Sequence, residues 1–431
     1  MLHVIIVGAG ISGLTCAITL AKYTHVQVTV LERAAVMDKA GNGIQVPCNA
    51  AHAMRCLGLL DKLLVKTNGP ATAFLNLKYD DGEILLHKDL TRCEELYGAP
   101  WLLIHRADYM TVLLDEARRV GVRIRLGCDV DSVDLDTPSV KLQNGHVYQA
   151  DVVESTPPSA PSCTRRHSPS QRANTPTARS SPARNSPPHP SGISSPPPAS
   201  PAAGWGPSPN AVFYPLQEGT LFNLVIAIAD PNFNNNTCDE QALLPSVRAW
   251  LSGWDPTLLE MLDAASHLVR FPLYQVAKLP FWSKGCVTLT GDAAHAMPPH
   301  LAQGAATGVE DGFILGTLLG RLSRHVSGPT RRAQLRTVLR AYETLQHDRT
   351  AQIVSGSRFT GMLDHLPQGP DQRARDAEFA MYDPEKTVSA MPWIDARTNR
   401  KLLGRKVDEV AEGEVARLLA AGEFADHGTK L

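Results

Sequence analysis

Three glycines and one acidic residue near the N-terminus have the spacing of a site that holds a dinucleotide. In LHVIIVGAGISGLTCAITLAKYTHVQVTVLERA, Gly8, Gly10 and Gly13 form G-x-G-x-x-G, and Glu32 lies nineteen positions after Gly13. The glycines allow a sharp turn, the approach of a pyrophosphate to the backbone, and close helix–strand packing. The following helix offers free N–H groups to phosphate, and the Glu32 carboxylate can accept hydrogen bonds from a ribose. The alternative is that the glycines only form a turn and Glu32 is a solvated strand end.

A second stretch, residues 285–322, combines a strand, a proline loop and a helix that suit a flavin. It reads GCVTLTGDAAHAMPPHLAQGAATGVEDGFILGTLLGRL, and its short apolar strand ends at Gly291 and Asp292. A carboxylate at a strand tip can bind the ribityl hydroxyls of a flavin. A helix that begins near Gly304 directs its N–H groups at whatever lies before it. The N-terminal position of the first motif, the acidic residue of its second strand and Ala17 also favour FAD over NAD.

Composition and cysteine spacing argue against several other classes of protein. The 431 residues are 43% hydrophobic and 20% charged, and the net charge of -1 gives no reason to expect nucleic-acid binding. No apolar run approaches the roughly 20 residues of a membrane helix. The sequence lacks H-E-x-x-H, G-x-S-x-G and P-loop motifs. The eight cysteines contain no C-x-x-C pair, so we expect no metal site and reduced thiols in a cytoplasmic protein.

Taken together, the ordered motifs resemble the class A FAD-dependent aromatic monooxygenases, the family of salicylate hydroxylase and p-hydroxybenzoate hydroxylase. The resemblance extends to GNGIQVPCNAAHAMRCLGLLDKL (residues 41–63) and LIHRADYMTVLLDEA (residues 103–117). FYPLQEGTLFNLVIAIAD and AYETLQHDRTAQIVSGSR also fit the family, so the resemblance covers most of residues 1–154 and 210–365. It implies an α/β fold with a discontinuous Rossmann-like FAD-binding domain, a smaller β-sheet substrate domain and a C-terminal helical segment.

The resemblance also implies which residues hold FAD. The four residues of the first motif would hold its ADP half. Asn42 and Gly43 would present their backbone to the cofactor, and Arg106 would reach its phosphate or ribityl region. Asp292 would bind the ribityl chain. The alternative for Arg106 is a surface cation at the start of a helix.

Four further residues are expected beside the flavin ring and the substrate. By the resemblance, Gly304 and Ala305 would donate backbone N–H groups to the isoalloxazine ring. Pro299 would wall the space between flavin and substrate, and Tyr214 in FYPL would position the substrate. The alternatives are that Pro299 is an ordinary loop proline and that Tyr214 is a half-buried aromatic residue of a strand.

The activity implied by the resemblance is hydroxylation of a small aromatic substrate by O2 with NADH or NADPH as reductant. The nicotinamide reduces FAD, O2 adds at flavin C4a, and the hydroperoxide transfers an oxygen atom to an electron-rich ring. The protein must keep water out and polarise or deprotonate a phenol. His295 and His300 lie near the flavin loop, and we expect them to be structural rather than catalytic bases. No second Rossmann motif is present, so we expect the nicotinamide to bind transiently.

Residues 155–209 differ in composition from both flanks. Fifteen of the thirty-two prolines lie between Pro157 and Pro209. Such a tract buries too little apolar surface to offset its ordering entropy, so we expect it to be disordered. After ADVV the family continues with a glycine and an Asp-Gly pair that helps bind FAD and the nicotinamide, whereas ESTPPSAP follows here. The tract is either a translated non-coding or frame-shifted stretch, or a flexible insert whose Arg-Ser-Pro sites bind partners.

The expected domains are discontinuous, and two other functions stay open. The expected boundaries are 1–78, 101–154 and 268–365 for the FAD-binding domain, 79–100 and 210–267 for the substrate domain, and 366–431 for a C-terminal helical segment that serves packing or a homodimer contact. One alternative is a flavin-binding member that lacks turnover because the Asp-Gly pair is missing. The other is an FAD oxidoreductase that inserts no oxygen, but the loop GDAAHAMPPHLAQGAATGVED favours the hydroxylases.

Overall fold

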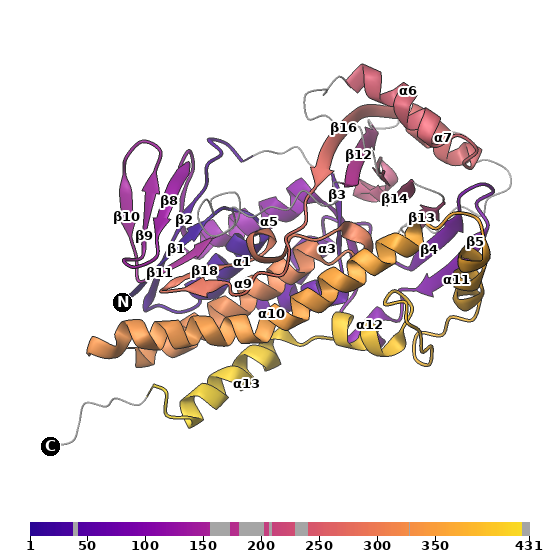
Figure 1. Ribbon diagram of the computed structural model, residues 1–431. Helices are drawn as coiled ribbons and strands as arrows, with labels where there is room; N and C mark the ends of the chain where they lie inside the picture. Colours follow the sequence, from indigo (N-terminus) through magenta and orange to yellow (C-terminus); the bar gives the residue numbers. More distant parts are fainter. Residues whose placement is uncertain are drawn as a thin grey trace.

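Two sheets lie side by side above one long helix. Figure 1 shows the first sheet and its helices on the left, the second sheet on the right, and α10 (Arg331–Asp364) along the lower side of both. The computed structural model describes residues 1–37, 42–155, 173–180, 202–206, 209–228, 240–326 and 328–424.

The first sheet has six strands in the order β17-β18-β11-β1-β2-β7, and its neighbouring strands are parallel except for β17 and β18. The strands are β1 (Leu2–Val7), β2 (Val26–Leu31), β7 (Arg123–Arg125), β11 (Val152–Ser155), β17 (Ser283–Lys284) and β18 (Val287–Leu289). Both faces of this sheet are covered, which explains why β1 is a continuous apolar run. Val4 and Ile6 pack in the core with the helices, whereas Ile5 and Val7 pack with a three-stranded meander. The meander consists of β8 (Val130–Asp134), β9 (Ser139–Leu142) and β10 (Val147–Gln149).

The helices of this part are grouped around a nearly completely buried helix, α9, which contacts α1, α2, α10 and α13. Their bounds are α1 (Ile11–Ala21), α2 (Cys48–Leu57), α3 (Leu60–Leu64), α5 (Arg106–Arg119), α8 (Asp292–His295), α9 (Gly304–Leu322) and α13 (Val407–Ala420). A two-stranded ribbon of β3 (Gly43–Val46) and β6 (Leu102–His105) lies beside them. The left-handed residue Gly58 ends α2, as is common at helix C-termini.

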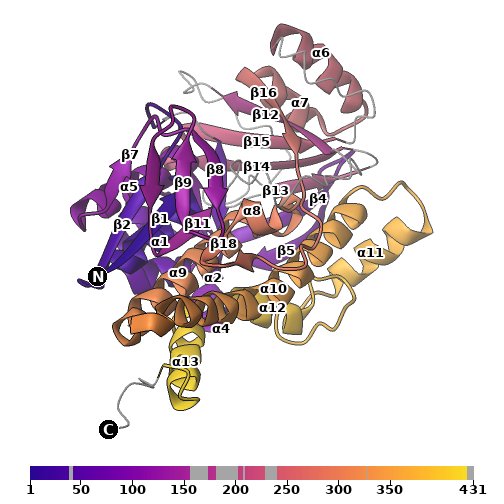
Figure 2. The same cartoon turned by 60° about the vertical axis from the view of Figure 1, so that its left-hand side comes forward.

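The second sheet has seven strands in the order β16-β12-β15-β14-β13-β4-β5, mostly antiparallel (Figure 2). The strands are β4 (Ala73–Lys78), β5 (Ile84–Asp89), β12 (Ala173–Ser180), β13 (Ala202–Trp205), β14 (Asn210–Leu216), β15 (Leu221–Ala227) and β16 (Ala265–Leu273). The other helices are α4 (Cys93–Tyr97), α6 (Glu240–Trp250), α7 (Pro256–Asp263), α11 (Pro370–Ala380) and α12 (Ala396–Leu403). Apolar side chains of α6 and α7 form one core with β15, so these helices cover one face of the sheet. Asp255 and Pro256 give α7 a typical start, because the Asp255 carboxylate accepts a hydrogen bond from the Thr257 N–H group at 2.7 Å.

The structure corrects the expectation of disorder for two segments of the proline-rich tract. β12 pairs with β15 and β16, and β13 pairs with β4 and β14, with all four residues of β13 buried. These segments are ordered by hydrogen bonds to strands that are distant in sequence, which composition does not reveal. Residues 156–172, 181–201 and 207–208 of the tract lie outside the described residues.

Two expected domain boundaries also differ from the sheet pairing. β4, assigned from sequence to the FAD-binding domain, pairs with β5 and β13 of the second sheet. β16 continues the same sheet to Leu273, beyond the expected boundary at residue 267.

The α/β fold class is confirmed, with one mainly parallel and one mainly antiparallel sheet and a helical C-terminal segment. Among the described helices, none is both long enough and apolar enough to cross a membrane.

Candidate functional site

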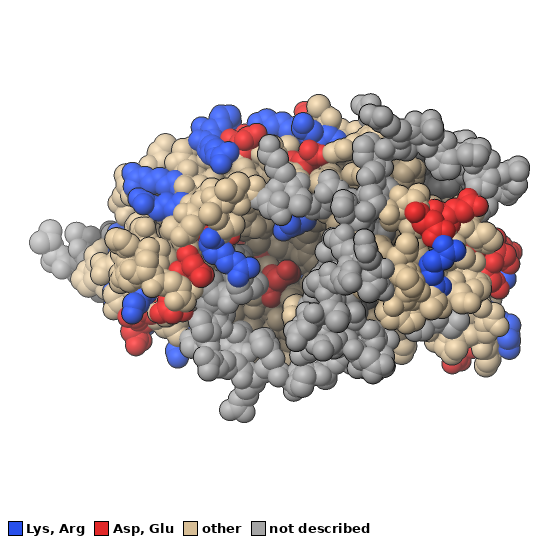
Figure 3. All heavy atoms as spheres, turned by 90° about the horizontal axis from the view of Figure 1, so that it is seen from above, with Lys and Arg blue, Asp and Glu red and all other residues tan. Residues whose placement is uncertain are grey.

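A cavity of about 760 Å³ is lined by residues from both sheets, and its size is in the range of about 300–1,000 Å³ found for ligand sites. Seen from above, the surface is hollowed near its centre (Figure 3). All of the site residues predicted from the sequence line this cavity except Gly13. Segments far apart in the sequence therefore meet at one place.

The N-terminal motif forms a strand, a tight turn and a helix at one end of the cavity. Gly8 follows β1 with φ of 106°, a left-handed conformation that only glycine adopts easily. In the described part of the chain, a Cβ atom on Gly10 would meet nothing within 4 Å apart from its chain neighbours, so the backbone there is open to a ligand. A Cβ atom on Gly13 would lie 2.3 Å from the Gly8 carbonyl oxygen. Gly13 therefore permits the close packing of α1 on β1 and does not itself face the cavity.

Glu32 lies at the end of β2 and is fixed by backbone hydrogen bonds. Its Oε2 accepts from the Ala9 N–H group at 2.8 Å, and its Oε1 accepts from the Ala34 N–H group at 2.9 Å. The carboxylate therefore joins the glycine turn to the end of β2. Each oxygen has a further lone pair that can accept from a ribose hydroxyl.

A row of glycines on α9 brings the second motif against the first. Gly308, Gly312, Gly316 and Gly320 recur at every fourth position and face α1 or the residues just after it. A Cβ atom on Gly312 would lie 2.5 Å from the Ser12 carbonyl oxygen. Ser12 also donates a hydrogen bond to Thr290 Oγ1 at 3.0 Å. Sequence reasoning missed this row, although the four-residue spacing of glycines is a visible signal of close helix packing.

Replacing Gly312 by alanine is expected to lower the free energy of unfolding by about 1–3 kcal/mol, because backbone atoms of α1 would have to move. Urea unfolding followed by circular dichroism measures the loss. Gly413→Ala is the matched control, since Gly413 lies inside α13 with open space around its Cβ position. Alanine there should stabilise the protein by about 0.5–1 kcal/mol. Equal effects of the two substitutions would contradict the close packing of α1 and α9.

The segment around Asp292 lies next to the glycine turn. Gly291 has φ of 55°, and its N–H group donates to Asp311 Oδ2 at 2.8 Å. This turn exposes the Asp292 side chain at the start of α8, where it lines the cavity. Asp292 is thus held at the strand tip on which the sequence-based prediction depends.

The N-terminus of α9 faces the cavity at Gly304 and Ala305. The preceding residue, Gln303, does not cap the helix with its side chain. Its Oε1 instead accepts from Asn49 Nδ2 at 3.0 Å. The first N–H groups of α9 are therefore left available to a ligand, at the positive end of the helix dipole.

Asn42, Gly43 and Arg106 meet where β3 and β6 pair. The Arg106 N–H group donates to the Asn42 carbonyl oxygen at 2.9 Å, and the Gly43 N–H group donates to Asn223 Oδ1 at 2.8 Å. A Cβ atom on Gly43 would lie 2.5 Å from the Tyr214 ring. Gly43 therefore gives Tyr214 of β14 the room to lie against the ribbon. The exposed Arg106 side chain begins α5 at the cavity wall.

The wall on the side of the seven-stranded sheet is rich in aromatic residues. Phe74, Trp205, Tyr214 and Trp393 line it, and the rings of Phe74 and Trp393 pack edge to face with centroids 4.9 Å apart. Trp393 Nε1 donates to Asn76 Oδ1 at 3.2 Å. Burial raises the pKa of Tyr214, so its hydroxyl group stays protonated at neutral pH and can donate a hydrogen bond. Pro299 begins a 3-10 turn, Pro299–Leu301, and also lines the cavity.

Several groups at the cavity were not predicted as site residues, among them Phe74, Trp205, Trp393 and Asp364. Trp393 comes from the C-terminal segment, in which the sequence shows no chemical motif. Asp364 at the end of α10 accepts from or donates to His300 Nδ1 at 2.7 Å, depending on their protonation. Both His300 and Asp364 line the cavity. The sequence offered no signal for either contact, since each joins segments more than sixty residues apart.

A buried cluster of charged side chains joins α9 to the helices around it. The Glu310 carboxylate is fully buried and accepts hydrogen bonds from Arg349, Arg405 and Asn49. Burial opposes ionisation of Glu310, but Arg349 and Arg405 outweigh it and lower the pKa of Glu310 to about 2. The neighbouring Asp311 accepts from Gln346 at 2.6 Å.

His295 belongs to the same buried support. Its Nε2 lies 2.6 Å from Asp311 Oδ2 in an almost completely buried ion pair. Burial favours the neutral ring, but Asp311 outweighs this and raises the pKa of His295. His295 does not line the cavity and is a structural residue, as expected.

At the end of β11 the sequence departs from the family motif. Glu154 and Ser155 are both buried, and β11 pairs with β18 up to Ser155. Thr290 donates a hydrogen bond to Glu154, and Glu154 Oε2 has no partner in the described part of the chain. The residues that would follow β11 lie outside the described residues.

Comparisons with known proteins agree with this architecture. A family model described as "FAD binding domain" matches residues 1–147 and 275–357. FAD-dependent monooxygenase OpS4 of Beauveria bassiana is 30% identical over 96% of this chain and 97% of its own length. 3-Amino-4-hydroxybenzoate 2-monooxygenase PtmB3 of Streptomyces platensis is 30% identical over 87% of this chain and 91% of its own length.

Solved structures with a similar fold include two flavoenzyme complexes. A salicylate hydroxylase substrate complex has a TM-score of 0.73 and 18% identity, covering 96% of this chain and 98% of that one. Klebsiella pneumoniae HpxO complexed with FAD and uric acid has a TM-score of 0.72 and 20% identity, covering 95% of this chain and 96% of that one. The family match and the relatives identify FAD as the cofactor. Because the family model matches both flanks of the tract and a relative is 30% identical over almost the whole chain, this chain belongs to the class A FAD-dependent aromatic monooxygenases.

Proposed function

We propose that the protein hydroxylates a small phenolic compound, using FAD, O2 and NADH or NADPH. The observation that carries this proposal is the composition of the single cavity described above. It is lined by the dinucleotide turn, by the N-terminus of α9 and by aromatic residues of the seven-stranded sheet. A cofactor and an aromatic ring can therefore lie next to each other in one cavity.

The chain's own groups fit the successive parts of FAD. The turn at Gly8 and Gly10 receives the pyrophosphate, and Glu32 accepts from the adenosine ribose. Asn42 and Gly43 would present the backbone groups that do not already bond Arg106 and Asn223. Arg106 would offer its guanidinium group to the phosphate or ribityl region. The fit is supported by the open space at the Gly10 Cβ position, which no described residue other than the chain neighbours of Gly10 approaches within 4 Å.

The flavin end is served by three other residues. Asp292 accepts from the ribityl hydroxyls, and the N–H groups of Gly304 and Ala305 donate to the edge of the ring. When bound, FAD supplies the redox and oxygen chemistry of the reaction. The positive end of α9 stabilises negative charge beside it, because its N–H groups are already oriented and need not reorganise.

The substrate is held by the aromatic wall. Phe74, Trp205 and Trp393 offer ring faces and edges to an aromatic compound. Tyr214 donates a hydrogen bond to a substrate oxygen, which its raised pKa permits. Pro299 separates the substrate from the cofactor without offering an N–H group that would compete for it. Together these apolar side chains exclude water from the reacting atoms.

Purified protein tests the proposal directly. The expected result is a yellow protein that oxidises NADH or NADPH faster when a phenolic compound is added, with a hydroxylated product detected by mass spectrometry. Oxidation that yields only hydrogen peroxide would contradict hydroxylation of the compounds tried. Repeated turnover of NAD(P)H without O2, with an added dye as electron acceptor, together with no hydroxylated product in air, would indicate a dehydrogenase instead.

A flavin-binding protein without turnover is the second candidate, and one observation favours it. Glu154 and Ser155 stand at the end of β11, where the sequence departs from the family's glycine and Asp-Gly pair. Bound FAD without any NAD(P)H oxidation, across both nicotinamides and a panel of phenols, would support this candidate over the first. A cytoplasmic location and a homodimer stay predictions.

Replacing Asp292 by alanine is expected to remove most of the bound FAD while the fold is retained. The side chain is exposed at the cavity wall, so its loss leaves no buried group unpaired. Flavin absorbance per protein measures the effect, and circular dichroism checks the fold. Asp115→Ala is the control, because Asp115 is an exposed acid on α5 with a weak ion pair to Arg118. Unchanged flavin content in the Asp292 variant would refute its assigned role.

A further inference from the structure

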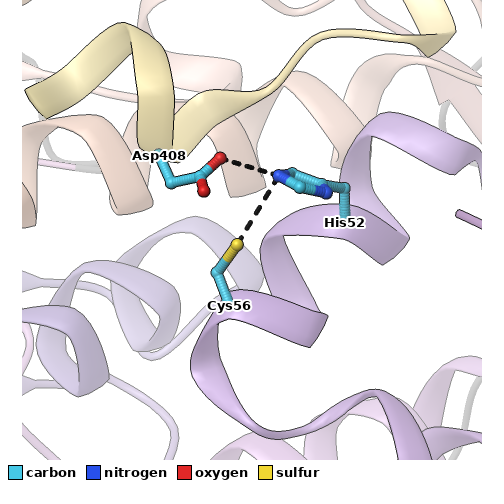
Figure 4. A group of neighbouring side chains, drawn as sticks. All are labelled: His52, Cys56 and Asp408. Atoms are coloured by element: carbon cyan, nitrogen blue, oxygen red, sulfur yellow. Dashed lines mark hydrogen bonds and ion pairs between the residues drawn. The ribbon is translucent and has the colours of Figure 1, made fainter. Parts of the chain in front are cut away.

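His52, Cys56 and Asp408 form a cluster of three metal-binding residue types outside the cavity. His52 and Cys56 lie one turn apart on α2, and Asp408 lies in the first turn of α13 (Figure 4). Asp408 Oδ1 is 2.7 Å from His52 Nε2, and Cys56 Sγ is 3.6 Å from the same nitrogen. One donor atom from each residue lies within 4.8 Å of the other two. The side chains point toward one another from two helices that are distant in the sequence.

The geometry argues against a catalytic triad. A nucleophile and an acid in a triad contact opposite nitrogens of the imidazole ring, so that the ring can pass a proton. Here both Asp408 and Cys56 approach Nε2, and Nδ1 is buried without a partner in the described part of the chain. Burial and the Asp408 carboxylate raise the pKa of the Cys56 thiol to about 11, whereas a nucleophilic cysteine needs a lowered pKa.

The convergence of three donors on one point is instead the arrangement of a metal site. We propose that His52, Cys56 and Asp408 bind one divalent transition-metal ion, with Zn²⁺ as the best match, through Nε2, Sγ and a carboxylate oxygen. Zn–S and Zn–N bonds at a tetrahedral angle place sulfur and nitrogen about 3.6 Å apart, which is the distance from Cys56 Sγ to His52 Nε2. The contact between Nε2 and Oδ1 would open by about 0.6 Å to reach tetrahedral geometry.

The surroundings allow an ion to enter and be neutralised. The His52 and Asp408 side chains are 12% and 44% exposed, so solvent reaches the site, and water can complete the coordination. Binding displaces the Cys56 thiol proton to solvent, and the resulting thiolate and the Asp408 carboxylate balance the two charges of the ion.

Three features weaken binding. The first is the raised pKa of the Cys56 thiol, because the ion must displace the proton of this thiol. Lys22 donates to the Cys56 carbonyl oxygen at 2.9 Å, and Lys406 is the residue just before α13. Two positive charges therefore lie close to the cluster and repel a metal cation. A zinc-bound histidine normally donates from its other nitrogen, but His52 Nδ1 has no acceptor among the described residues. We therefore expect micromolar affinity rather than the tighter binding of a structural zinc site. The ion would join α13 to α2 and so fix the C-terminal helix on the FAD-binding part.

The FAD-loaded protein, freed of metal with a chelating resin, is titrated with Zn²⁺ by calorimetry. We expect one ion per chain and a rise in the melting temperature with Zn²⁺ concentration. Cys56→Ser and Asp408→Asn preserve size and hydrogen bonding, and each should lower the affinity at least about 10–100-fold, the loss seen even for outer-shell partners. Co²⁺ in place of Zn²⁺ should give visible tetrahedral bands beyond the flavin absorption, and these should disappear in Cys56→Ser.

The matched control is Asp348→Asn. Asp348 lies 3.3 Å from His347 at an exposed site, but among the described residues no third metal-binding side chain completes a cluster with them. Its substitution should leave Zn²⁺ affinity unchanged. Retained flavin content shows that each variant is folded. Binding of Zn²⁺ that is equally strong in wild type, Cys56→Ser and Asp408→Asn, or no binding at micromolar concentrations, would overturn the proposal.

Discussion

Replacing Glu310 by alanine is expected to lower the free energy of unfolding by about 3–5 kcal/mol, the cost of breaking a buried ion pair by removing one partner. Arg349 donates to both carboxylate oxygens, at 2.7 and 2.8 Å, and Arg405 donates to Oε2 at 2.7 Å. The two arginine side chains are only 17% and 10% exposed. Alanine would therefore leave two largely buried cations without their acidic partner.

The cluster also connects four parts of the chain, which makes its loss costly for the site. Glu310 is on α9, Arg349 on α10, Arg405 precedes α13, and Asn49 on α2 reaches both Glu310 and Gln303. Because Gln303 precedes the N-terminus of α9, we expect the Glu310 variant to lose FAD as well as stability. Urea unfolding and flavin absorbance measure the two effects.

Glu412→Ala is the matched control for this prediction. Glu412 pairs with Arg321 at 2.9 Å, but the two side chains are 46% and 51% exposed. Exposed ion pairs contribute about 0–1 kcal/mol, so this variant should remain close to wild type. Glu310→Gln should fall between the two, since it keeps the shape and some hydrogen bonds but not the charge. If Glu310→Ala were no less stable than Glu412→Ala, the buried cluster would not support the fold.

The second large effect expected is a fall in stability with rising pH that depends on Glu154. Burial raises the pKa of Glu154 to about 8, Asp311 adds to the rise, and the hydrogen bond from Thr290 opposes it. Between pH 4.5 and 8 the unfolded chain releases this proton while the folded chain keeps it. The folded state then binds more protons, so the free energy of unfolding decreases as pH rises and levels off above pH 8.

The size of this effect follows from the difference between the two pKa values. About 3.5 pH units at about 1.4 kcal/mol each correspond to a loss of up to about 5 kcal/mol. Glu154→Gln stays uncharged at every pH and removes this loss. We expect it to match wild type at pH 5 and to be several kcal/mol more stable at pH 8.5.

Urea midpoints of the FAD-loaded protein at pH 5, 7 and 8.5 test this expectation. Glu83→Gln serves as the control. Glu83 is an exposed residue just before β5 of the second sheet, so its substitution should leave the pH dependence of stability unchanged. Parallel pH profiles for wild type and Glu154→Gln would show that Glu154 is ionised in the folded protein, contrary to the prediction.

The residues expected to hold FAD could be found in the sequence because their signals are local. G-x-G-x-x-G specifies a turn and a helix start within six positions, and the following strand brings Glu32 back to the turn by the geometry of a parallel unit. The strand tip at Asp292 and the helix from Gly304 are also marked by short-range patterns of apolar residues and glycines. The cavity lining agrees with these residues one by one, apart from Gly13, whose function is packing.

The substrate side could not be predicted to the same degree. The composition of residues 155–209 indicates disorder, yet β13 is buried between β4 and β14. A strand gains its hydrogen bonds from partners far along the chain, so neither proline content nor propensity determines whether it forms. Trp393 reaches the cavity for the same reason, from a segment without a motif of its own.

By itself, the sequence determined the class of fold, the cofactor and the residues that follow strands and begin helices. Strand ends and helix starts depend on residues that are close together in the chain, so short motifs reveal them. Only the tertiary structure decided which distant charges meet. Arg349 and Arg405 converge on Glu310, and Asp408 reaches His52 across 356 positions. The energy of such contacts depends on burial and on distances of a few ångströms, and neither is encoded in spacing along the chain.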